Sequence, residues 1–134
     1  MTIKRMIKGD VPRSFGAFKP VGHVVVAFDN DEQATQAASA LSSSGFKDED
    51  ILQYSALEEA EQMKELLGLT SGMAEFGHEV ALMRKYRELA GEGCGWLIVY
   101  APEDADAARV AEVAQRFNAR LAEKYHRLVV EDLL

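Results

Sequence analysis

The hydrophobic pattern begins at "HVVVAFD", residues 23–29, where apolar residues follow one another without alternating with polar ones. This pattern predicts a short strand that is buried on both faces. After Asp29 or Asn30, either of which can cap a helix, one helical face carries Ala34, Ala37, Ala38 and Leu41. Their spacing of three and four residues predicts an amphipathic helix. We expect it to end at Gly45 in a left-handed conformation, with Phe46 folding back onto it.

The next segment predicts a second strand at residues 51–55, followed by a helical insertion. Ser55 and Glu58 have the spacing of a capping box. A first helical stripe follows at Leu57, Ala60, Met63, Leu66 and Leu67. After a break at "TSGMAEFG", a second stripe consists of Phe76, Val80, Met83, Tyr86 and Leu89 and ends near Gly91.

The last third of the chain predicts a buried strand, a helix and a closing strand. The strand is "WLIVYA", residues 96–101, and Pro102 stands where a first helical residue is favoured. Acidic residues follow it, as suits the positive end of a helix dipole. The helical stripe comprises Ala107, Val110, Ala114, Phe117 and Leu121. We expect "RLVVEDLL", residues 127–134, to form the final strand.

This order of elements predicts an α+β fold. Without the insertion at about residues 56–91, it reads β-α-β-β-α-β, the ferredoxin-like unit, in which two helices cover one face of an antiparallel sheet. We expect the insertion or a second subunit to cover the other face. The predicted organisation is therefore a basic irregular arm at residues 1–20 and a single ferredoxin-like domain at residues 21–134.

Charge is distributed unevenly along the chain. The 134 residues carry a formal net charge of −7, but residues 1–20 hold five basic residues and one acidic residue, which leaves −11 on the remainder. A body this acidic repels a nucleic-acid backbone, so we expect no nucleic-acid partner. No stretch is long and apolar enough to span a membrane, and the first twenty residues have no signal-peptide core. We expect a cytoplasmic homodimer with a small-molecule or protein partner, and no cofactor.

A resemblance to a known family starts from "HVVVAFDNDEQATQAASALSSSGFKDEDI", residues 23–51. A strand that ends in aspartate, an alanine-rich helix that ends in "GF" and an acidic "DEDI" resemble the opening of the bacterial heat-induced (general stress) protein domain. The segment "HEVALMRKYRELAGEGCGWLIVYAPEDADAARVAEVAQ" is also similar to small bacterial proteins that carry this domain. The resemblance implies a ferredoxin-like fold and a stress-linked or regulatory role without catalysis.

The glycine-rich segment "GEGCG", residues 91–95, invites two functional interpretations. Phosphate-binding glycines follow a strand and open a helix, whereas these follow a helix and open a strand. The carbonyl end of the helix and Glu92 both oppose an anion. The same surroundings raise the pKa of a thiol, so Cys94 is better explained as a small buried side chain than as a nucleophile. We expect Gly91 to end the helix, and Gly93 and Gly95 to ease a tight turn.

The histidines do not form a metal motif. His23, His78 and His126 lack helical ligand spacing, and we expect the first and last strands not to be neighbours, which separates His23 from His126. Folding could still bring a histidine to Asp29 or Glu131. The segment "MRKYRE", residues 83–88, gathers basic side chains and could bind an anion or an acidic partner, but a solvated basic face explains it better.

These observations favour a non-enzymatic binding or regulatory module. Ligands prefer concave apolar clefts with a few polar groups, so we place a site between the open face of the sheet and the insertion. The predicted ligand-binding residues are Tyr54, Phe76, His78, Met83, Arg84, Tyr86, Trp96 and Tyr100. No catalytic or metal-binding residue is predicted. One alternative is a small dimeric enzyme of the cofactor-independent monooxygenase or haem-binding type, with His78 or His23 as its key residue. Another is a structural protein–protein interaction domain.

Overall fold

The chain forms an α+β structure around one five-stranded antiparallel sheet. The computed structural model describes residues 13–14, 17–18, 21–55, 58, 77–126 and 129–134. The strand order in the sheet is β4-β5-β3-β6-β7. Its strands are β3 (His23–Phe28), β4 (Ile51–Tyr54), β5 (Gly95–Tyr100), β6 (Leu121–Tyr125) and β7 (Val130–Asp132). The helices in the described residues are α1 (Asp31–Ser43), α3 (Gly77–Gly91) and α4 (Asp104–Arg116), with a short 3₁₀ turn η1 (Asp48–Asp50).

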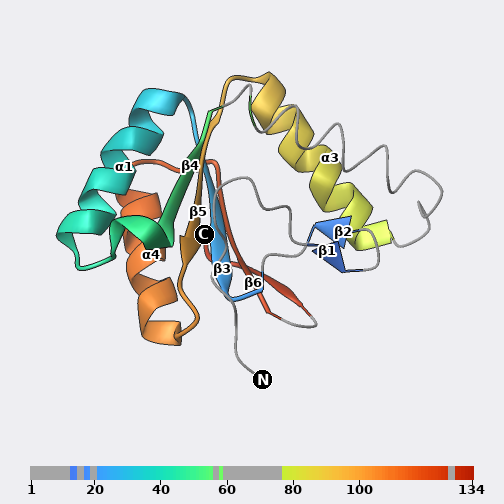
Figure 1. The fold of residues 1–134 in the computed structure, drawn as a ribbon. Coiled ribbons are helices and arrows are strands. Elements are labelled where there is room, and N and C mark those ends of the chain that lie inside the picture. The colour runs from blue at the N-terminus through green and yellow to red at the C-terminus, as the bar shows by residue number, and fades with distance from the viewer. Residues whose placement is uncertain (1–12, 15–16, 19–20, 56–57, 59–76, 127–128) are drawn as a thin grey trace.

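Helices cover both faces of the sheet. Helices α1 and α4 lie on one face and α3 lies on the other, beside the two-residue strands β1 (Arg13–Ser14) and β2 (Ala17–Phe18) (Figure 1). Successive strand residues point to opposite faces, so Val24 and Val26 pack toward α1 and α4, while Val25 and Ala27 pack toward α3. The unbroken apolar run of β3 is thus explained, because every residue in it is buried.

Helix α1 has the predicted beginning and end. The side chain of Asn30 accepts a hydrogen bond from the backbone N–H of Gln33 at 2.8 Å, which satisfies one of the exposed donors of the first turn. At the other end Gly45 has φ +107°, and the N–H of Phe46 donates to the carbonyl of Leu41 at 3.2 Å. Phe46 is 8% exposed, so it folds back onto the core as predicted.

The glycines after α3 have three different roles. Gly91 is the last residue of the helix. Gly93 has φ +93°, the left-handed conformation that closes the helix, and the next N–H, that of Cys94, donates to the carbonyl of Leu89 at 3.2 Å. Gly95 begins β5 where that strand passes the start of α1. A methyl group on Gly95 would lie 2.7 Å from the carbonyl oxygen of Asn30, so only glycine fits there.

The structure corrects the predicted boundaries around α4. Pro102 is not the first helical residue, because Glu103 is the N-cap and the helix begins at Asp104. The helix also stops at Arg116, five residues before the predicted Leu121. Asn118 adopts φ +57°, a conformation that asparagine tolerates, and the chain reverses there.

The two C-terminal strands also differ from the prediction. Strand β7 (Val130–Asp132) lies within the predicted final strand, whereas β6 (Leu121–Tyr125), which begins at the last residue of the predicted helical stripe, is a fifth strand that was not predicted. The first strand, β3, and the predicted last strand, β7, are not neighbours, as expected, because β6 lies between them. Strand β3 lies between β5 and β6, with Val25 opposite Glu123 and Ala27 opposite Leu121.

The predicted insertion is described in part. The capping box at its start is confirmed, because the N–H of Ser55 donates to Glu58 at 2.9 Å and the N–H of Glu58 donates to the Ser55 hydroxyl at 3.1 Å. The second predicted helix is α3. All residues of the first helical stripe, and residues 70–76 of the predicted break, lie outside the described residues. The arm that was expected to be irregular contains the β1–β2 pair, in which Arg13 lies opposite Phe18.

Candidate functional site

A buried polar cluster lies between α3 and the sheet. The hydroxyl oxygen of Tyr86, on α3, lies 2.8 Å from that of Tyr125 and 3.2 Å from Oε2 of Glu123, both on β6. Their exposed fractions are 0% for Tyr86, 8% for Glu123 and 3% for Tyr125. Charged residues are rarely buried without partners, and the hydrogen bond from Tyr86 is one of the contacts that stabilise Glu123 at this position.

The local structure explains why these side chains meet. Strand β6 alternates, so that Glu123 and Tyr125 point toward α3 together with Leu121, whereas Ala122 points toward α1 and α4. On α3, Tyr86 shares its inward face with Leu89 and Ala90. The sequence reasoning missed Glu123 and Tyr125 because it extended the preceding helix to Leu121. Residues 121–125, "LAEKY", do not alternate between apolar and polar types, so Asn118 as a turn residue is the one local sign that the helix ends before them.

Burial fixes the protonation state of Tyr86. Desolvation raises the pKa of Tyr86 well above the usual value for tyrosine, and the neighbouring Tyr125 and Glu123 raise it further. Tyr86 is therefore a neutral phenol that donates its one proton to the Glu123 carboxylate. A hydroxyl group has a single proton, so Tyr125 must donate in the Tyr86–Tyr125 bond.

Trp96 packs directly against this cluster. Its ring centroid lies 5.2 Å from that of Tyr86, with the two planes at 60°. The residue is 0% exposed, and its indole Nε1 is buried with no hydrogen-bond partner among the residues that the structure describes. An indole N–H can only donate, and a buried donor that lacks an acceptor costs about 1–3 kcal/mol.

His23 and Tyr100 lie on the same face of the sheet. They are opposite one another on β3 and β5, and their ring centroids are 5.1 Å apart. His23 is 1% exposed, and its Nδ1 lies 3.0 Å from the carbonyl oxygen of Val21. A carbonyl oxygen only accepts, so Nδ1 carries a proton and, in the neutral ring, Nε2 is the acceptor.

The predicted site residues divide into three groups. Tyr54, Tyr86 and Trp96 come together in one buried cluster on the face of the sheet that α3 covers. Tyr100 is half-buried on the same strand as Trp96, while Arg84 is exposed on α3. Phe76 lies outside the described residues, and His78 and Met83 lie in the part of α3 where only the backbone is described.

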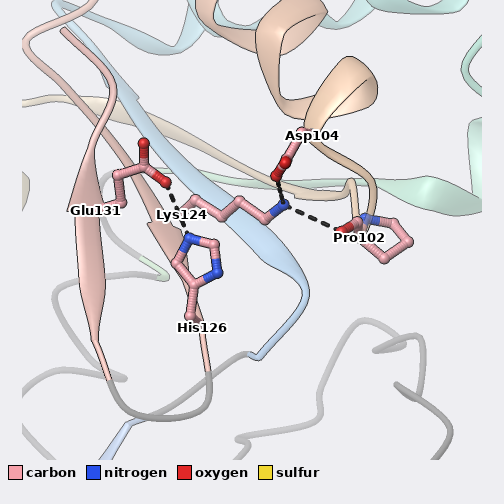
Figure 2. Close-up of polar contacts among 5 residues, drawn as sticks. All are labelled: Pro102, Asp104, Lys124, His126 and Glu131. Carbon is pink, nitrogen blue, oxygen red and sulfur yellow. Dashed lines mark hydrogen bonds and ion pairs between the residues drawn. The ribbon is translucent and has the colours of Figure 1, made fainter.

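A second polar group lies on the opposite face of β6 (Figure 2). The Lys124 side chain is 4% exposed, and its Nζ donates to the carbonyl of Pro102 at 3.1 Å and lies 3.7 Å from Asp104. Nε2 of His126 lies 2.9 Å from the Glu131 carboxylate, one of the two pairings that the sequence left open. Lys124 ties β6 to the start of α4, and the His126–Glu131 contact ties β6 to β7. Both arrangements are structural.

The glycine-rich segment carries no reactive thiol. Cys94 is 0% exposed, and burial raises the pKa of its thiol, an effect that Arg120 opposes and that Glu92 and Asp29 reinforce. A raised pKa keeps the thiol protonated and weakly nucleophilic. Among the residues that the structure describes, no three or more His, Cys, Asp or Glu side chains are grouped so that they could hold a metal ion.

Comparisons with known proteins leave the family open. No protein-family model, curated protein or solved structure matches the chain. The likeness to the heat-induced protein domain therefore stays a prediction. In the described part of the chain, no helix has the length and apolarity needed to cross a membrane.

Proposed function

We propose that the protein is a non-enzymatic binding module that holds a small molecule beneath α3, against the sheet. The observation that carries this proposal is the indole N–H of Trp96, which is buried beside the Tyr86–Glu123–Tyr125 cluster and has no acceptor in the described part of the chain. A ligand that brings a carbonyl oxygen or a ring nitrogen to this point would satisfy the donor. The resemblance to a stress protein domain supports a regulatory role for such binding.

The chemistry of the cluster defines the class of ligand. Aromatic rings from Tyr86 and Trp96 favour a flat, largely apolar molecule, because aromatic pairs gain energy beyond the area they bury. The Glu123 carboxylate favours a hydrogen-bond donor elsewhere on the same molecule. The expected ligand is therefore a planar heterocycle with both an acceptor and a donor, and it needs no covalent chemistry.

We further propose that β3, α1, β4, β5, α4 and β6 form a ferredoxin-like core to which α3 and β7 are additions. The support is that α1 and α4 follow β3 and β5 respectively and lie on the same face of the sheet (Figure 1). In that arrangement the face opposite the two helices is the surface that an inserted segment can cover or uncover. The proposed binding site lies on this face, between the sheet and α3.

Trp96 itself provides the test, because it is the only tryptophan in the chain. Planar heterocycles are titrated into the protein while its tryptophan emission and its thermal midpoint are followed. A ligand beneath α3 should change the emission in a saturable way and raise the midpoint. The W96F variant, measured by calorimetry, should bind several-fold more weakly, because about 1 kcal/mol of hydrogen bonding is lost.

A matched control is E88A, which alters an exposed residue of the same helix outside the predicted site and should leave the affinity unchanged. If no compound changes both signals, or if W96F binds as tightly as the wild type, the site is not where we place it.

A second candidate is the enzyme of the haem-binding or monooxygenase type. The observation that favours it is the buried imidazole of His23, beside Tyr100 and on the same face of the sheet as Glu123. Added haem should then give a Soret band that H23A removes. H126A, which alters the partly exposed histidine paired with Glu131, should keep it. A protein that gives no Soret band and consumes no oxygen excludes this candidate.

A further inference from the structure

Strand β4 forms one edge of the sheet. Among the described strands it pairs only with β5, with Leu52 opposite Ile98 and Tyr54 opposite Trp96. The outer edge of a strand can pair with another extended chain through its backbone groups. Ile51, Leu52 and Gln53 are all half-buried, so β4 offers both backbone and side chains to a neighbour.

A groove runs between this edge and α1. Its volume is about 350 Å³, and it is lined by Ala38, Ser39, Ser42, Asp48, Ile51 and Gln53. The space exists because α1 presents small side chains toward β4. Hydrogen bonds mark its two ends: the Gln53 amide donates to the Thr35 hydroxyl at 2.8 Å, and the Ser42 hydroxyl donates to Asp48 at 3.2 Å.

This geometry suits an added strand. A peptide that pairs with β4 directs every second side chain toward the same side of the sheet, and on the α1 side these side chains enter the groove. Main-chain hydrogen bonds supply affinity in this mode of recognition, and the groove supplies selectivity for side chains of modest size. The bond between Gln53 and Thr35 holds the helix and the strand at a fixed separation.

The negative charge around the groove favours a basic partner. Residues 31–54 contain five carboxylates and one lysine, a formal net charge of −4. Asp48 and Glu49 are exposed at the end of the groove where β4 begins. A second copy of the chain would bring a second acidic segment to the same edge, and like charges disfavour that pairing. A peptide rich in lysine or arginine is attracted instead.

We propose that an extended basic segment of another protein adds to the sheet as a strand beside β4. Its alternate side chains enter the groove between α1 and β4, and its lysine or arginine side chains face Asp48 and Glu49. This surface lies on the face of the sheet opposite to the cluster beneath α3. The proposal therefore stands or falls separately from the proposed small-molecule function.

Selection from a random seven-residue peptide library against the full-length protein tests the idea. Selected peptides should be enriched in lysine or arginine and should lose binding when alternate backbone nitrogens are methylated, because methylation removes the donors that strand pairing needs. The D48N/E49Q variant should bind them roughly three- to tenfold more weakly at low salt. A control variant, E88Q/E112Q, removes two carboxylates from α3 and α4 and should bind normally.

Variant A38L tests the groove itself, since a larger side chain there should block the peptide while the fold, checked by circular dichroism, is kept. The proposal is overturned if the selected peptides are not basic, if methylation has no effect, or if A38L and D48N/E49Q bind like the wild type. It is also overturned if a peptide of residues 1–20 outcompetes every selected sequence, or if light scattering shows a dimer that A38L dissociates. Those two results would assign the groove to the chain's own arm or to a second copy.

Discussion

Replacing Gly95 with alanine places a methyl group against the backbone at the start of α1. The added carbon would lie 2.7 Å from both the carbonyl oxygen of Asn30 and the Cα of Asp31. These are main-chain atoms at the N-terminus of a capped helix, so they cannot rotate away as a flexible side chain would. Either β5 or the first turn of α1 must shift.

The cost can be worked out from this contact. Overpacking a close-packed interior costs about 1–3 kcal/mol, and a backbone contact belongs toward the upper part of that range. The replacement also lowers the entropy of the unfolded chain, which returns about 0.4–1 kcal/mol. We therefore expect G95A to lower the free energy of unfolding by about 2 kcal/mol. For a chain of this length that corresponds to a thermal midpoint about 6–10 °C lower.

The neighbouring glycines are matched controls in the same segment. An alanine at Gly91 would meet nothing within 4 Å, and Gly91 ends a helix, so G91A should be neutral or stabilising by up to about 1 kcal/mol. An alanine at Gly93 also meets nothing within 4 Å, but the backbone there has φ +93°, which costs about 1–2 kcal/mol in strain. From the most to the least stable, the expected order is G91A, G93A and G95A.

Urea unfolding followed by circular dichroism measures this order, with thermal scans as a second readout. Equal m-values for the three variants would show that their free energies of unfolding can be compared directly. The close approach of β5 to α1 does not require glycine if the free energy of unfolding of G95A lies within about 0.5 kcal/mol of the wild-type value, or if G95A is more stable than G93A.

Two further predictions concern titration and reactivity. Because the pKa of Tyr86 is raised above the unfolded value of about 10, its contribution to stability is complete below that pH and is lost as the pH rises through the folded value. Tyrosinate absorbance should show a late component that Y86F removes; a wild type in which every tyrosine ionises near its ordinary pKa would contradict this. Cys94 is buried and its thiol pKa is raised, so Ellman's reagent should react with it at a rate limited by unfolding. Fast reaction of the folded protein, or a rate unchanged in urea, would show an accessible thiolate.

The sequence by itself determined the local features of this protein. The cap at Asn30 and the left-handed Gly45 depend on neighbouring residues, because each satisfies backbone groups within one turn of the chain. The apolar run of β3 likewise predicts burial on both faces. At residues 91–95, the order of a helix, then glycines, then a strand is enough to argue against a phosphate site.

The tertiary structure decided what depends on contacts between distant segments. Leu121 fits a helical stripe as well as a strand, and its pairing opposite Ala27 settles the choice in favour of β6. That choice in turn directs Glu123 and Tyr125 toward Tyr86, 37 and 39 residues away in sequence. Local periodicity carries no information about which strands become neighbours. The buried polar cluster beneath α3 therefore follows from strand order, and no local pattern predicts it.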